Sequence, residues 1–202
     1  MNNLEYKVPS LYKIMDKRGF FNSKSYLWLN DMEWLSIDKI EKYEHEKGES
    51  KAVIPFAFTS GGDKWVWVIN TSNEDYPVGL CYREEWNGVY YAKNMEDAIF
   101  RQIIEYVASS NFYLNLKDAE SYQISEYKLK FLLRYWEKSF TGILNDKYLD
   151  VINGFLDLKL KKVKNKYGEW YALLTLEEQD KLINKFINFD LLNKEFEWFS
   201  KC

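Results

Sequence analysis

The chain of 202 residues has few side chains that could carry out acid–base or nucleophilic chemistry. Its single histidine, His45, lies between two glutamates on the polar side of an expected helix, where we expect a solvated surface position. Neighbouring residues on a helix point about 100° apart, so this trio does not converge on a metal ion. Neither cysteine, Cys81 or Cys202, has a histidine at a spacing typical of thiol catalysis. We therefore expect no enzyme activity, no bound metal and no cofactor.

Two adjacent glycines, Gly61 and Gly62, raise the question of a phosphate-binding loop. The Walker motif requires a Gly-Lys-Ser/Thr step ahead of a helix, whereas Asp63 and Lys64 here lead into an apolar run typical of a strand. The glycines instead suit the positive φ of a tight hairpin turn. We expect the Asp63 carboxylate to accept hydrogen bonds within this turn, with contact to a partner as the alternative.

Two loops carry adjacent carboxylates, Glu74 with Asp75 and Glu84 with Glu85. In an antiparallel meander these loops lie at opposite ends of the sheet, which argues against a hydrolase with paired carboxylates. Trp86 follows the second pair in a polar loop and is the best candidate for an exposed aromatic residue. Each acidic pair is either a contact for a partner or an ordinary solvated loop. We predict that Trp86 and these four carboxylates bind a protein partner.

Two further groups of residues suggest ligands but have simpler structural explanations. Trp65 and Trp67 share one face of a regular strand and could stack on a sugar, but strands on both sides favour a buried position for them. A lysine-rich run at residues 159–166 could contact nucleic acid or anionic lipid. Polar and apolar residues alternate around Val163, however, as in a half-exposed edge strand that uses lysine to prevent edge pairing.

The stretch at residues 53–70 is the expected centre of the fold. Two apolar runs flank the Gly-Gly turn, which predicts a β-hairpin. Both faces of each run are apolar, so helices or other chain should cover both faces of this hairpin. Pro55 lacks a backbone donor and predicts an edge or a bulge at that point. We expect Ile54, Phe56 and Ile103 to be buried together with the two tryptophans of the hairpin.

Helices and further strands are expected around the hairpin. Ser36 and Asn94 are the expected N-caps of two helices, Gly48 is expected to end the first of them, and Thr175 with Glu178 matches a capping box. Residues 195–199 are compatible with either a helix or a strand. The expected helices cover residues 9–18, 37–47, 95–107, 118–140, 146–156 and 176–188, and the expected further strands cover 25–30, 78–83, 89–92, 158–164 and 169–174.

Composition is typical of a globular protein, with 47% hydrophobic and 29% charged residues. No apolar run approaches the ~20 residues of a membrane span, and the first residues lack the apolar core of a signal peptide. The two cysteines do not suggest a disulfide framework, so we expect a cytoplasmic protein. The expected fold class is α+β, with an antiparallel-rich sheet of about five or six strands packed with helices. We expect residues 1–112 to form this domain, and residues 113–202 to form a C-terminal helical extension with a small hairpin, packed on it as one globular unit.

Several of these residues match short motifs of the SUKH superfamily, which includes fungal cell-wall regulators of the Smi–Knr type and many bacterial immunity proteins. The resemblance covers roughly the first half of the chain. The matching residues are Trp34, then Ile54, Pro55, Phe56 and Ala57, then Gly61, Gly62 and Asp63, then the aromatic strand from Trp65, and finally Ser109, Ser110, Asn111 and Phe112.

The resemblance implies an α+β fold and a non-enzymatic protein-binding function. Bacterial members of the superfamily look like immunity proteins, which bind and neutralise a cognate toxin that is often a nuclease. The partner implied by the resemblance is therefore a protein toxin. The alternative is a regulator of cell-wall or polysaccharide synthesis that also acts by binding protein, and an uncharacterised hydrolase is the least supported. Residues 1–110 carry a net charge of −4 and residues 111–202 carry +1. This balance disfavours nucleic acid and suits a basic partner, although it is also compatible with ordinary surface charge.

Overall fold

The computed structural model describes residues 6–21, 32–69, 75–109, 119–166 and 168–200. Contacts divide the chain into two compact units, one of residues 1–99 with 187–202 and one of residues 100–186. This division differs from the expected boundary at residues 112 and 113. The C-terminal residues belong with the first unit because they return to its sheet.

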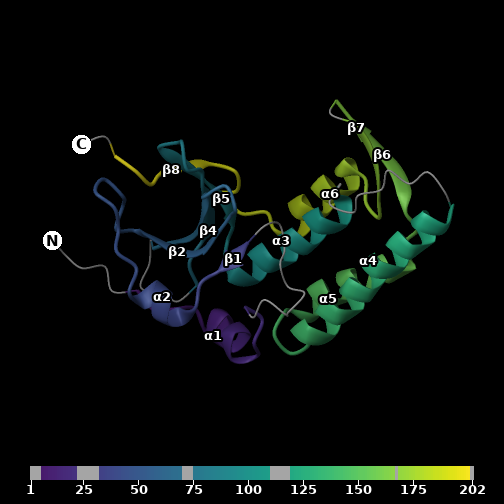
Figure 1. Cartoon of the computed structure of the whole chain (residues 1–202), viewed down its shortest axis with the longest axis horizontal. Helices are drawn as coiled ribbons and strands as arrows, with labels where there is room; N and C mark the ends of the chain where they lie inside the picture. The colour runs from purple at the N-terminus through teal and green to yellow at the C-terminus, as the bar shows by residue number, and fades with distance from the viewer. Residues whose placement is uncertain (1–5, 22–31, 70–74, 110–118, 167, 201–202) are drawn as a thin grey trace. The chain divides into compact units, whose positions relative to one another are not determined.

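The first unit is built on an open antiparallel sheet of six strands in the order β1-β2-β3-β4-β5-β8 (Figure 1). Consecutive strands are neighbours as far as β5, and the C-terminal β8 pairs with the outer edge of β5. The α+β class and the expected number of strands are therefore confirmed. The strands are β1 (Glu33–Trp34), β2 (Val53–Phe58), β3 (Lys64–Val68), β4 (Val78–Cys81), β5 (Asn87–Ala92) and β8 (Glu195–Glu197).

The β2–β3 hairpin lies inside the sheet, as its apolar runs predict. Its turn is closed by a hydrogen bond of 3.0 Å from the Thr59 amide to the Asp63 carbonyl oxygen. Gly62 in this turn has a φ of 88°, a value that glycine adopts without strain. The register of the hairpin shifts between Pro55 and Ala57, so a bulge accommodates the proline, as predicted.

One face of the sheet is covered by helices, because alternate strand residues bring large aromatic rings to that side. Helix α1 (Ser10–Lys17) contributes Tyr12, whose ring meets the ring of Trp67 edge-on at 5.1 Å. The Tyr12 hydroxyl donates to the Phe56 carbonyl oxygen at 3.0 Å. Figure 1 shows α1 and α2 (Ile37–Glu41) on this side. The five residues expected in the core are all 5% exposed or less: Ile54, Phe56, Trp65, Trp67 and Ile103.

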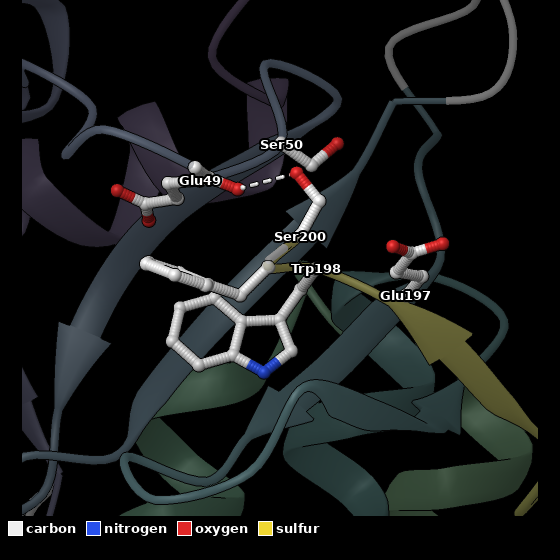
Figure 2. Close-up of a pocket in the computed structure, with 7 residues that line it drawn as sticks. Glu49, Ser50, Glu197, Trp198 and Ser200 are labelled. Atoms are coloured by element: carbon white, nitrogen blue, oxygen red, sulfur yellow. Dashed lines mark hydrogen bonds between the residues drawn. The ribbon is translucent and has the colours of Figure 1, made fainter. Parts of the chain in front are cut away.

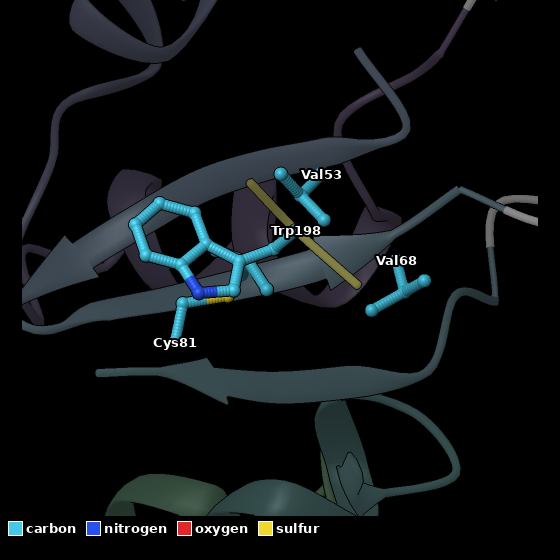
Figure 3. Packing of buried hydrophobic residues seen from close by; sticks show 5 residues of the cluster. Val53, Val68, Cys81 and Trp198 are labelled. Atoms are coloured by element: carbon cyan, nitrogen blue, oxygen red, sulfur yellow. The ribbon is translucent and has the colours of Figure 1, made fainter. Parts of the chain in front are cut away.

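The opposite face is covered by residues 194–200, which we call the C-terminal segment. Its Trp198 is 4% exposed and packs against Val53, Val68 and Cys81 (Figure 3). The Trp198 amide donates to the carbonyl oxygen of Trp86 at 3.1 Å. Both faces of the central hairpin are therefore covered, by helices on one side and by this segment on the other.

The helix expected at residues 37–47 is shorter than predicted. Ser36 caps it as expected, but α2 ends at Glu41. Gly48 has a φ of 94°, yet it does not terminate a helix. A Cβ atom at this position would lie 2.8 Å from the backbone oxygen of Ser200, so the glycine is required by the close approach of the C-terminal segment.

The second unit contains the remainder of α3 (Met95–Ala108) and the elements that follow it. Its core includes Trp136, which is fully buried and meets the Tyr106 ring edge-on at 5.0 Å. Tyr148 stacks on Phe100 with 4.0 Å between ring centroids. The other elements are α4 (Ala119–Phe140), α5 (Asp146–Gly154), a 3-10 helix (Phe155–Asp157), β6 (Lys161–Asn165), β7 (Gly168–Ala172) and α6 (Leu176–Phe186).

Local sequence signals in the second unit are confirmed. Thr175 and Glu178 form the predicted capping box, with the Thr175 amide 2.7 Å from the Glu178 carboxylate and the Glu178 amide 3.2 Å from the Thr175 hydroxyl. The predicted small hairpin is β6–β7, where exposed Lys162 and Lys164 alternate with buried Val163. The strand expected at residues 25–30 lies outside the described residues. No helix in the described part of the chain is long and apolar enough to cross a membrane.

Candidate functional site

A pocket of about 560 Å³ opens in the first unit, at the end of the sheet where the β2–β3 and β4–β5 turns meet. The Asp63 carboxylate joins the two turns, because it accepts a hydrogen bond of 3.1 Å from the Arg83 amide. Within its own turn the same carboxylate accepts a hydrogen bond of 3.3 Å from the Thr59 hydroxyl, and the Asp63 amide donates to that hydroxyl at 3.0 Å. Asp63 therefore has the expected role within its turn, and in addition it fixes the position of the loop that follows β4.

Aromatic side chains form one wall of this pocket. Trp86 is 43% exposed, as predicted, and its ring packs edge-to-face with the ring of Phe199, with 5.5 Å between centroids. Its carbonyl oxygen accepts hydrogen bonds from the amides of Trp198 and Phe199, at 3.1 and 3.3 Å. The C-terminal segment thus fixes the backbone of Trp86, while much of the indole remains accessible to a partner.

Carboxylates lie around the same pocket. Glu84 and Glu85 line it and are exposed, and neither forms a salt bridge with any residue of the described ranges. Glu46 lines the pocket from the loop after α2, and its side chain is 73% exposed. The pocket therefore combines aromatic surface with three solvent-accessible negative charges.

A buried polar cluster lies directly behind the pocket. The Glu49 side chain has no exposed surface and accepts hydrogen bonds from the Tyr43 hydroxyl at 2.9 Å and from the Lys64 ammonium at 3.1 Å. Lys64 Nζ also lies 5.3 Å from the centroid of the Trp198 ring. Burial by itself would lower the pKa of Lys64, but its hydrogen bonds with Tyr43 and Glu49 outweigh that effect and raise this pKa above the ordinary value. Lys64 is therefore held in its charged form.

A second, smaller pocket of about 320 Å³ is also lined by Trp198 (Figure 2). It is bounded by Gly48–Ser50 and by Glu197–Ser200, which run antiparallel to each other. The Ser50 amide donates to the Trp198 carbonyl oxygen at 2.8 Å, and the Ser200 amide donates to the Gly48 carbonyl oxygen at 2.9 Å. These two bonds fix the end of the C-terminal segment beside Glu49.

The structure brings together only part of the predicted binding surface. Trp86, Glu84 and Glu85 line one pocket. Asp75 is exposed but precedes β4, whereas Glu84 follows it, so the two loops lie at opposite ends of the sheet. Asp75 therefore does not belong to this site, as the meander geometry required. Glu74 lies outside the described residues.

His45 lies elsewhere than expected, whereas Cys81 lies in a strand, β4, as predicted. His45 was expected to be solvated on a helix, but it follows the end of α2 and is half-buried, with Nε2 2.8 Å from the Val53 carbonyl oxygen. A carbonyl oxygen only accepts, so Nε2 donates and the ring has a structural role. Cys81 is a buried free thiol, and burial raises its pKa. Within the described ranges, no group of three or more potential ligand side chains could hold a metal ion.

Sequence reasoning missed the parts of this site that come from distant segments. The contributions of Glu46, Lys64 and Phe199 depend on contacts between the loop after α2, the sheet and the C-terminal segment. One local signal was present, because residues 195–198 alternate acidic and aromatic side chains, a pattern typical of a strand. That pattern favours the strand over the helix for this segment, but it does not show where the strand pairs.

Comparison of the chain with protein-family models, with curated proteins and with solved structures finds no match. The likeness to the SUKH superfamily therefore rests on the motif residues alone. In the structure, Ile54, Pro55 and Phe56 lie in β2, whose register shifts between Pro55 and Ala57, and Trp65 in β3 lies opposite Ala57. The motif glycines form the turn between these strands, and Trp34 lies in β1.

Proposed function

We propose that this chain is a non-enzymatic protein-binding module whose contact surface is the pocket around Trp86. The observation that carries the proposal is the half-exposed indole of Trp86 beside the exposed carboxylates of Glu84 and Glu85. Binding energy in protein interfaces concentrates on a few aromatic and charged anchors surrounded by weaker contacts. An accessible tryptophan with its backbone fixed by hydrogen bonds has the features of such an anchor.

The partner that we propose is a basic protein toxin, and the function is its neutralisation. The motif resemblance to SUKH immunity proteins supports this class of partner. Charge complementarity also supports it, because the active site of a nuclease must be basic to hold phosphate, and the pocket presents Glu46, Glu84 and Glu85. A regulator of cell-wall synthesis would bind its partner through the same surface, so the identity of the partner separates the two functions.

The test uses the product of the gene directly upstream. Its toxicity is compared when it is expressed alone and together with this chain, and its binding to this chain is measured. An immunity function predicts that this product is toxic alone, that co-expression removes the toxicity, and that the two proteins form a complex in titration calorimetry. A non-toxic upstream product that does not bind would overturn the toxin-neutralising function. An upstream product that acts on the cell wall and binds through Trp86 would favour the regulator.

Trp86→Ala should weaken that complex about 30-fold, the equivalent of about 2 kcal/mol for an interface anchor. The same substitution should lower the free energy of unfolding by only about 1 kcal/mol, because the half-exposed ring packs on Phe199. Titration calorimetry and urea denaturation measure the two quantities separately.

The matched control is Tyr127→Ala, which removes another exposed aromatic side chain, from α4. This control should leave the affinity unchanged. A large loss of stability in Trp86→Ala with unchanged affinity would assign the residue to the core and remove the proposed anchor.

A further inference from the structure

We propose that the pocket around Trp86 takes the guanidinium group of an arginine side chain from the protein partner. This inference rests on the proposed function and deepens it, because it names the chemical group that the pocket recognises. The composition of the pocket wall, the volume of the pocket and the contacts of the chain's own Lys64 ammonium favour this occupant.

The pocket already has one cation bound within its inner wall. The Lys64 ammonium donates to the Tyr43 hydroxyl at 2.8 Å and to Glu49 at 3.1 Å, and it lies over the rings of Trp198 and Tyr43 at 5.3 and 5.5 Å. Aromatic faces and a carboxylate thus hold a cation in this part of the molecule, by the cation–π and charge-assisted contacts that are strongest away from water.

The outer wall repeats this combination of groups. Trp86 and Phe199 supply aromatic surface, while Glu84, Glu85 and Glu46 supply carboxylates that reach solvent. The volume of about 560 Å³ lies within the range of roughly 300–1,000 Å³ typical of ligand pockets, so a long side chain fits. The outer wall is therefore complementary to a second cation, supplied from outside the chain.

Two cations of the chain also line the pocket, and they decide between a cationic and an anionic occupant. The charge of Lys64 is compensated by the Glu49 carboxylate at 3.1 Å, and a second carboxylate, that of Glu46, lies 4.0 Å from the same ammonium. Arg83 is the remaining cation of the pocket wall, and its single positive charge is outnumbered by the two carboxylates of Glu84 and Glu85, which follow it in the sequence. Negative charge is in excess, so a positively charged occupant is favoured.

Arginine fits this wall better than lysine. Its guanidinium is planar, stacks on aromatic faces and presents paired donors that match carboxylates, whereas the lysine ammonium is a compact and strongly hydrated charge. Trp86 offers an accessible ring, and Glu84 and Glu85 offer carboxylates on the same loop. The pocket therefore discriminates between the two basic side chains.

The test uses the full chain and three blocked tripeptides with arginine, lysine or citrulline between two glycines. Citrulline has the shape of arginine without its charge. Shifts of the Trp86 indole N–H signal, assigned by comparison with Trp86→Phe, report binding in NMR titrations. We expect the arginine peptide to bind about tenfold more tightly than the citrulline peptide and about threefold more tightly than the lysine peptide.

Substitutions around the pocket give effects of opposite sign. Arg83→Gln removes the opposing cation and should tighten binding of the arginine peptide about threefold, whereas Glu84→Gln with Glu85→Gln should weaken it about fivefold. Asp75→Asn, at the other end of the sheet, should have no effect. Weaker binding in Arg83→Gln would indicate an anionic occupant and overturn the proposal.

The outcome is separable from that of the proposed function. No shift with the arginine peptide, or equal shifts with the arginine and citrulline peptides, would overturn the arginine site even if the partner binds through Trp86. Conversely, specific binding of the arginine peptide would support the site even if the upstream gene product does not bind, in which case the toxin-neutralising function alone would fail.

Discussion

The carboxylate of Glu49 is completely buried, and its oxygens accept hydrogen bonds from the preceding loop and from the start of β3. Lys64 and Tyr43 bind its oxygens through side-chain donors, and the Glu46 amide donates to Oε2 at 3.0 Å. A buried carboxylate is tolerated only when it is paired and hydrogen-bonded in this way. The cluster therefore joins the loop after α2 to the start of β3, and in doing so it fixes the inner wall of the pocket.

Glu49→Gln should lower the free energy of unfolding by about 3 kcal/mol, because it leaves the largely buried Lys64 without its counter-charge. Urea denaturation at neutral pH measures the change. The matched control is Glu46→Gln, which lies 4.0 Å from the same ammonium but is 73% exposed. This control substitution should lower the free energy of unfolding by less than about 0.5 kcal/mol. Equal losses in the two variants would show that burial of Glu49 does not determine its contribution.

At the scale of elements, two glycines allow the C-terminal segment to lie flat on the sheet. Gly79 in β4 and Gly88 in β5 face the ring of Phe196, and a Cβ atom at either position would lie 2.6 Å from that ring. Real side chains do not approach so closely, so both positions require glycine for steric reasons. The absence of side chains here lets β8 pair with β5 while Phe196 also packs on Tyr90, at 4.7 Å between centroids.

Gly79→Ala should lower the free energy of unfolding by about 1–3 kcal/mol, because the added methyl group displaces the Phe196 ring. In a Phe196→Ala background the same substitution should lower the free energy of unfolding much less, because the ring that the methyl group would meet is then absent. The four proteins form a double-mutant cycle measured by thermal or urea denaturation. A cost that is the same in both backgrounds would show that the clash is not with Phe196.

At the scale of the whole molecule, the distribution of charge matches the position of the pocket. The net charge of the chain is −3. Residues 1–110, which supply most of the pocket, carry a net charge of −4, whereas residues 111–202 carry +1. An uneven field of this kind accelerates the approach of an oppositely charged protein, and salt screens it over about 10 Å. The rate of association is therefore the quantity most sensitive to these charges.

Glu84→Lys with Glu85→Lys should slow association with a basic partner about tenfold at low ionic strength, and the difference should shrink as salt is added. Stopped-flow or surface-based kinetics measure the rate. Asp38→Lys with Glu41→Lys makes the same change in net charge at two exposed positions of α2 and serves as the control. Equal slowing by both double substitutions would mean that total charge, rather than the pocket, steers the partner.

Local sequence was sufficient for most elements of this chain. The β2–β3 hairpin, the bulge at Pro55, the caps of α2 and α6 and the exposure of Trp86 were all predicted correctly. Each depends on residues within a few positions of one another, such as a proline without a donor or a capping box. Hydrophobic runs also identified the core, because strands that are apolar on both faces must be covered on both faces.

The tertiary structure decided where α2 ends, which residues accompany Trp86 and which segment covers the second face of the sheet. Gly48 was interpreted as a helix end, but it is required by the approach of the C-terminal segment. Asp75 carries the same charge as Glu84, yet β4 separates the two loops. Phe199 reaches Trp86 across more than half of the chain. Sequence pattern determines which residues favour burial or a turn, whereas the pairing of distant segments depends on packing between them, and that pairing assembles the pocket.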